Sequence, residues 1–166
     1  MSDQAQAMAG KVKSWLLKTK LSSPKFKIKG TEFVISKIPP MQSFDVAEFI
    51  RFNLAKSADS FSIDDKSSET DNAILFFKAV LGLDPAVVAH IREELFAYIE
   101  FTGSGVEKGY MPLAGAEDMA FQNFEVVHVY EVIGRALFIN FFGSFAGIAS
   151  AFPGAESFIK SHLPKT

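Results

Sequence analysis

The feature that most constrains the fold is an apolar run at residues 136–152, ALFINFFGSFAGIASAF. A helix that crosses a membrane needs about 20 predominantly apolar residues, and this run is shorter and contains Asn140. Glu131 and Arg135 lie directly upstream and would enter the bilayer with it. The run therefore predicts a helix that is buried in the protein core or covered by a partner, and a membrane span is disfavoured.

A helical projection of the segment before and within this run divides it into two stripes. The first stripe is apolar and predicts a core face. The second is polar around Glu131 and Arg135, which are spaced for an i,i+4 ion pair, and becomes aromatic one turn later at Phe138 and Phe142. Those phenylalanines either complete the domain's own core or form an exposed surface for another protein, and the sequence leaves both possibilities open.

Upstream of this segment, the sequence predicts a small β-hairpin followed by helices. Phe26 and Ile28 alternate with lysines before Gly30-Thr31, and Phe33 and Ile35 alternate after it, which is typical of two paired strands. Helical periodicity and end signals then predict a helix from a Ser43 cap, followed by a loop over 57–72 and a helix over 73–82. A further helix is predicted over 84–101, where Asp84-Pro85 marks its start. An irregular connection over 103–117 then leads to a helix from about 121 to 152, which breaks near Gly143.

Composition favours one compact domain with a basic extension. A chain of 166 residues can bury a sizeable core, and the absence of cysteine excludes disulfides and thiolate chemistry. Residues 1–37 carry eight lysines against Asp3 and Glu32, whereas the remainder is acidic. We predict a mainly α fold with a small N-terminal β-hairpin (α+β), divided into a basic amphipathic arm over 1–22, a compact helical domain over 23–153 and a C-terminal tail over 154–166.

Catalytic and metal-binding patterns are weak. Glu125, His128 and Glu131 share one side of a predicted helix, but a carboxylate-bridged metal bundle needs a second copy of this element. His90 with Glu93 and Glu94 lies on an ordinary polar helix face. Neither a nucleophile elbow nor a phosphate-binding loop is present. The start of the chain does not resemble a secretory signal, and its lysines lack the arginine and aromatic partners of nucleic-acid readout. We expect no enzyme activity, no cofactor, no metal and no nucleic-acid partner.

Two sequence blocks resemble the tail assembly chaperones of long-tailed bacteriophages. The first is ISKIPPMQSFDVAEFIRFNL, in which Lys37, Ile38, Pro39 and Ser43 match the family's entry into its first helix. The second is AEDMAFQNFEVVHVYEVIGRALFINFFGSF, in which the matching residues are Asp118, Phe121, Asn140, Phe141, Phe142 and Phe145. The resemblance covers roughly residues 25–147 and leaves out the lysine-rich arm and the tail.

The resemblance implies a non-enzymatic protein of the infected host cytoplasm that keeps the tape-measure protein soluble during tail-tube assembly and is absent from the mature virion. The tail-tube protein and a second copy of the chain are further expected partners. We predict that the partner-binding residues are Phe138, Phe141, Phe142 and Phe145, with Trp15 on the basic arm as a second candidate. The alternatives are a structural tail or baseplate component and, less favoured, a small membrane-active protein.

Overall fold

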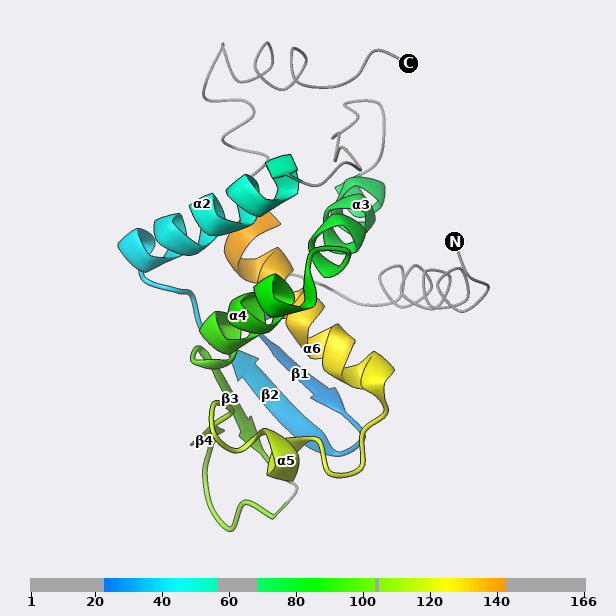
Figure 1. Ribbon diagram of the computed structural model, residues 1–166. Coiled ribbons are helices and arrows are strands. Elements are labelled where there is room, and N and C mark those ends of the chain that lie inside the picture. Colours follow the sequence, from blue (N-terminus) through cyan, green and yellow to red (C-terminus); the bar gives the residue numbers. More distant parts are fainter. Residues whose placement is uncertain (1–22, 57–68, 104, 143–166) are drawn as a thin grey trace.

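A computed structural model describes residues 23–56, 69–103 and 105–142. These residues form a mixed α+β domain in which helices pack on one four-stranded antiparallel sheet (Figure 1). The sheet has the order β1-β2-β3-β4, with strands β1 (Lys25–Ile28), β2 (Thr31–Ile35), β3 (Ile99–Thr102) and β4 (Met111–Pro112). The predicted hairpin is confirmed, but it is half of a larger sheet.

The hairpin turns one residue earlier than the sequence suggested. Lys29 and Gly30 both have positive φ, 45° and 89°, as the two central residues of a type I′ turn require. Thr31 therefore begins β2 opposite Ile28, and Phe26 pairs with Phe33. This register directs alternate apolar side chains of β1 and β2 into the core and leaves Lys25 and Lys27 exposed.

The segment over 97–102 is the largest error of the sequence-based prediction. Helix α4 (Pro85–Phe96) begins as expected, because the Asp84 carboxylate accepts a hydrogen bond from the Ala86 backbone N–H at 2.9 Å. It ends at Phe96, and the chain continues as β3, in which Ile99 and Phe101 pair with Ile35 and Phe33 of β2. Pairing with a strand that lies far away in the sequence outweighs the local helical pattern.

The remaining helices differ from the predictions mainly at their ends. Helix α2 (Pro40–Lys56) starts before Ser43, with Pro40 as its first residue, and Ser43 donates its backbone N–H to the Pro39 carbonyl at 2.8 Å. Helix α3 (Glu69–Leu81) begins four residues earlier than predicted and stops before Gly82. Helix α5 (Glu117–Ala120) lies before the helix predicted from about residue 121. Of that predicted helix, residues 121–125 are not helical, and the described part is α6 (Val126–Leu137) followed by the π-helix η1 (Phe138–Phe142).

The helices surround one hydrophobic core. Helix α6 packs against α4 and continues into η1, which contacts α2 and α3, and α4 also contacts α2 and β3. Figure 1 shows α2 and α3 at one end of the domain and α5 with the β3–β4 connection at the other. Much of the aromatic content fills this core, where Phe33 contacts the rings of Phe26, Phe101, Phe121 and Phe124. The predicted arm over 1–22, the predicted break near Gly143 and the predicted tail over 154–166 lie outside the described residues.

Candidate binding surface on helix α2

The predicted phenylalanine surface is only partly described, and its centre is buried. Phe141 has no exposed surface, so it belongs to the domain's own core and is not accessible to a partner in this structure. Phe138 is half-buried and packs against that core. Phe142 ends η1, but its side chain lies outside the described part of the structure, as do Phe145 and Trp15. The structure thus corrects the prediction at Phe141 and leaves Phe142, Phe145 and Trp15 as predictions.

The stripe that looked polar in the sequence also points inward. Arg135 is 3% exposed and forms the expected i,i+4 ion pair with Glu131, with 3.3 Å between Nη2 and Oε1. Its guanidinium carbon lies 4.2 Å from the centre of the Phe26 ring, which places the cation over the aromatic face. Burial lowers the pKa of Arg135, and the Glu131 carboxylate opposes that shift. The pair is therefore a buried feature of the core and differs from a solvated surface pair.

Asn140 fixes η1 to the connection between β2 and α2. Its Oδ1 accepts a hydrogen bond from the Ile38 backbone N–H at 2.9 Å, and its Nδ2 donates to the Ala136 carbonyl at 3.1 Å. Lys37 donates from Nζ to the carbonyl of Ile139 in the same region. The polar residue inside the apolar run is thereby satisfied within the protein, as a buried amide requires.

Among the described residues, α2 carries more exposed large apolar side chains than any other element. Met41 is 75% exposed, Phe44 is 59% exposed and Phe52 is 54% exposed, whereas Val46 and Ile50 on the opposite side of the helix are buried. These positions fall on two faces because side chains three or four residues apart lie on the same side of a helix. Helix α2 thus packs on the core with one side and presents large apolar groups on the other.

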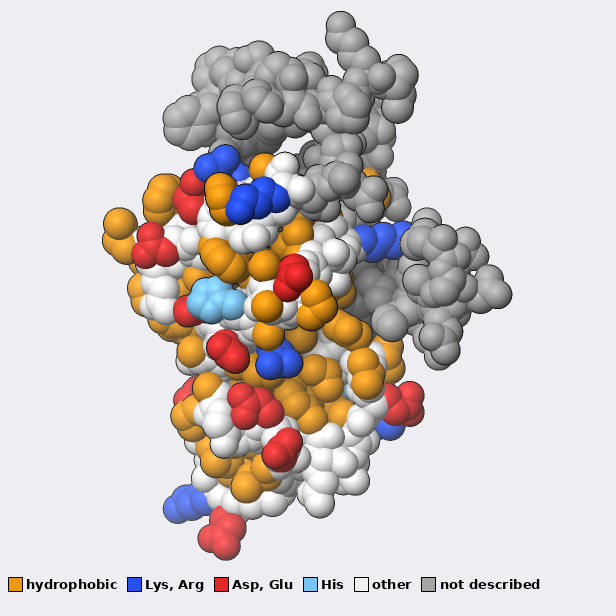
Figure 2. Space-filling view, in the orientation of Figure 1, with side chains coloured by type: hydrophobic (Ala, Val, Ile, Leu, Met, Phe, Trp, Pro, Cys, Tyr) orange, Lys and Arg blue, Asp and Glu red, His pale blue; other side chains and the backbone are white. Residues whose placement is uncertain are grey.

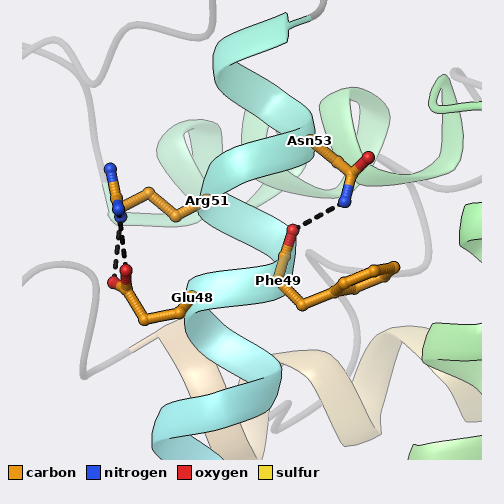
Figure 3. Close-up of polar contacts among 4 residues, drawn as sticks. All are labelled: Glu48, Phe49, Arg51 and Asn53. Carbon is orange, nitrogen blue, oxygen red and sulfur yellow. Dashed lines mark hydrogen bonds and ion pairs between the residues drawn. The ribbon is translucent and has the colours of Figure 1, made fainter.

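Charged residues separate the apolar groups along this face. Arg51 binds Glu48 through two hydrogen bonds, from Nε to Oε1 at 2.9 Å and from Nη2 to Oε2 at 2.7 Å (Figure 3). These bonds lower the pKa of the Glu48 carboxyl and raise that of Arg51. Near the C-terminal end, the Lys56 ammonium lies 4.0 Å from the centre of the Phe52 ring. We call the residues Met41, Phe44, Asp45, Glu48, Arg51, Phe52 and Lys56 the outer face of α2; all are exposed except Glu48, which is half-buried.

Other exposed apolar side chains are dispersed over different elements. Val126 is at the start of α6, Leu75 on α3, Met119 on α5, and Tyr110 just before β4. Figure 2 shows hydrophobic and acidic side chains over the left, N-terminal part of α2 and basic ones toward its other end. The outer face of α2 is therefore the strongest candidate for a protein-binding surface among the described residues.

The histidines and carboxylates of the two weak metal-like motifs make contacts that stabilise the fold. His128 Nδ1 accepts a hydrogen bond from the Glu125 backbone N–H at 3.1 Å, which caps the start of α6. His90 contacts the edge of the Phe49 ring, with 4.8 Å between ring centres, and Glu94 accepts a hydrogen bond from Gln42. Within residues 23–56, 69–103 and 105–142, no group of three or more acidic or histidine side chains is arranged to hold a metal ion.

In the same ranges, no helix has both the length and the apolar character needed to cross a membrane. Comparisons of the chain with protein-family models, with curated proteins and with solved structures found no match.

Proposed function

We propose that this chain is a non-enzymatic tail assembly chaperone of a long-tailed bacteriophage, and that its client is the tape-measure protein. The observation that carries the proposal is the outer face of α2, where Met41, Phe44 and Phe52 expose more than half of their surface. Large apolar groups gathered on one exposed helix face are typical of protein-binding surfaces. All three residues belong to the first block that resembles the chaperone family.

The two resembling blocks also form one structural unit, which supports treating them together. Ile38 belongs to the first block and Asn140 to the second, and their hydrogen bond joins segments about a hundred residues apart in the sequence. This unit holds α2 so that its buried side packs on the core and its outer face remains accessible. The contact between Ile38 and Asn140 supports the view that the two blocks belong to one fold of the chaperone type. The outer face of α2 would give that fold a surface for a client.

In the proposed mechanism, an amphipathic helix of the client lies along α2. Its apolar side chains pack against Phe44 and Phe52, and its polar side chains remain beside Glu48 and Arg51. Coating apolar stripes in this way keeps a long helical client soluble while tube subunits, a second expected partner, polymerise around it. Because no covalent step is involved, the chaperone leaves when tube subunits compete for the client. The proposed site of action is the host cytoplasm.

The test is coexpression of the full chain with fragments of the very long helical protein encoded beside it. We expect the wild-type chain to copurify with such fragments and to raise their soluble fraction. The variant Phe44→Ser/Phe52→Ser should lose both effects. The control is Val126→Ser, which removes an equally exposed apolar side chain from α6 and should leave binding unchanged. Equal binding by all three proteins would contradict the proposed surface.

A second measurement separates a chaperone from a structural component. Mass spectrometry of purified virions should find the tube protein and the tape-measure protein but not this chain. Stoichiometric recovery of the chain from virions would favour a tail or baseplate component and overturn the chaperone proposal.

A further inference from the structure

The outer face of α2 is nearly symmetric about the middle of the helix. Glu48 is the central residue of Pro40–Lys56. Phe44 and Phe52 lie four residues to either side of it, so each is about 6 Å from the centre along the helix axis. A phenylalanine is thus present on each side of a central ion pair, and these two positions exchange when the helix direction is reversed. Met41 has the smaller, exposed Ala55 as its counterpart.

The charges on this face change sign across the same centre. Asp45 lies in the N-terminal half, Glu48 is at the centre, and Arg51 and Lys56 lie in the C-terminal half. Asp45, Arg51 and Lys56 are exposed, and Glu48 is half-buried. A helix of this kind complements a second copy of itself in antiparallel orientation, because the acidic half of each helix then lies beside the basic half of the other.

We propose that the outer face of α2 pairs with the α2 helix of a second copy of this chain, antiparallel and about a twofold axis near Glu48. A twofold contact uses the same surface on both copies, which is the condition that this charge pattern meets. Phe44 of each copy then lies next to Phe52 of the other, and Asp45 of each copy lies beside Arg51 of the other. The two Glu48 side chains meet at the axis, where each is bound by Arg51 of its own helix.

The pairing has a regulatory consequence, which rests on the proposed function. A dimer formed through α2 covers the apolar groups that would otherwise contact the client, so the free chaperone protects its own binding surface. A single pair of helices covers less than the roughly 800 Å² per partner that is usual for stable complexes. We therefore expect a reversible dimer with a dissociation constant on the order of micromolar, weak enough for a client to displace the second copy.

The first experiment measures self-association without any client. Sedimentation equilibrium of the full chain should show a monomer–dimer equilibrium that shifts toward monomer as salt concentration rises. The acidic variant Arg51→Glu/Lys56→Glu and the basic variant Asp45→Lys/Glu48→Lys should each be monomeric alone, with dissociation constants raised by about tenfold or more. An equimolar mixture of the two variants should form a heterodimer.

The matched control for the acidic variant is Lys27→Glu/Lys108→Glu, which makes the same change in net charge at exposed positions on β1 and the β3–β4 connection. It should dimerise like the wild type. Circular dichroism and thermal melting of each variant show whether the fold is intact, and heterodimer formation itself requires folded partners. A wild-type chain that is monomeric up to hundreds of micromolar, or variants that still dimerise alone, would overturn the proposal.

A competition experiment then separates this inference from the proposed function. Adding a client fragment to the wild-type dimer should yield a chaperone–client complex that contains one copy of the chaperone and no homodimer. A chain that dimerises through α2 but binds no tape-measure fragment would contradict the proposed function and leave the dimer standing. A chain that binds the fragment while both of its copies remain paired through α2 would contradict the regulatory role.

Discussion

Asn140 and Ile38 are joined by a buried hydrogen bond of 2.9 Å from the Ile38 backbone N–H to Asn140 Oδ1. This bond fixes the π-helix η1 to the segment that leads from β2 into α2. It also explains why a polar residue stands within the apolar run over 136–152. The backbone N–H of Ile38 lies between β2 and α2, and the Asn140 amide supplies the acceptor that neither element provides.

The first prediction concerns this bond. Asn140→Ala should lower the free energy of unfolding by about 2 kcal/mol, because it leaves the buried Ile38 N–H without its acceptor. Asn53→Ala is the matched control: Asn53 Nδ2 donates to the Phe49 carbonyl four residues earlier (Figure 3), just as Asn140 donates to Ala136, but it holds no other segment. Urea unfolding should show a loss of about 0.5 kcal/mol or less for the control. Equal losses would contradict the role given to Asn140.

The second prediction concerns the contact between α6 and α3 at Gly134. A Cβ atom at this position would lie 1.8 Å from Phe77 Cζ, so the Phe77 ring occupies the space that any side chain here would need. Gly134→Ala should therefore destabilise the protein by about 3 kcal/mol through overpacking. Adding Phe77→Leu should recover part of the loss, since the smaller side chain gives the new methyl group room. If the double variant is less stable than the sum of the two single changes, the proposed contact is wrong.

The third prediction concerns the buried ion pair of Arg135 and Glu131. Glu131→Gln should cost about 2 kcal/mol, because it removes the carboxylate that compensates a guanidinium enclosed by the core. In an Arg135→Met background the same change should cost well under 1 kcal/mol, since no buried cation remains. Chemical denaturation of the four proteins in this cycle gives the coupling energy. A coupling energy near zero would mean that the two charges act independently.

The fourth prediction concerns pH. Arg51 lowers the pKa of Glu48 from its usual value of 4.5, so the folded state binds a proton at this site less readily than the unfolded chain. The stabilisation is present above pH 4.5 and is lost as the pH falls through the lowered pKa. NMR titration of the Glu48 carboxyl carbon should give a midpoint below that in Arg51→Gln. Because both side chains are about half exposed, the contribution to stability should stay within tenths of a kcal/mol.

The sequence predicted those elements whose signals are local. The hairpin over β1 and β2 follows from alternation on both sides of a glycine turn, and the start of α4 follows from Asp84 and Pro85, whose side chains act within one turn. Val46 and Ile50 lie four residues apart, so helical spacing places both on the buried side of α2. These features depend on neighbouring residues, so the order of the amino acids is sufficient to reveal them.

The candidate site was less predictable. The sequence predicts a partner surface near residue 140 because the helix there becomes aromatic after Arg135 and belongs to the second resembling block, yet Phe141 is enclosed by other elements. The sequence does not single out Met41, Phe44 and Phe52, because apolar residues on both faces of α2 obscure its amphipathic pattern. A projection of α2 that marked large apolar residues opposite Val46 and Ile50 would have found them. The family resemblance pointed to this block, but it did not say which side chains are exposed.

The sequence by itself determined the hairpin, the start of α4 and an apolar run too short and too polar for a bilayer, because these depend on composition and short-range spacing. Tertiary structure decided the rest. It made residues 99–102 a strand, because β2 offered a partner from far away in the chain. It buried Arg135 and Phe141 and left α2 with one side uncovered, because burial depends on which elements are packed around a residue, and local sequence does not specify that packing.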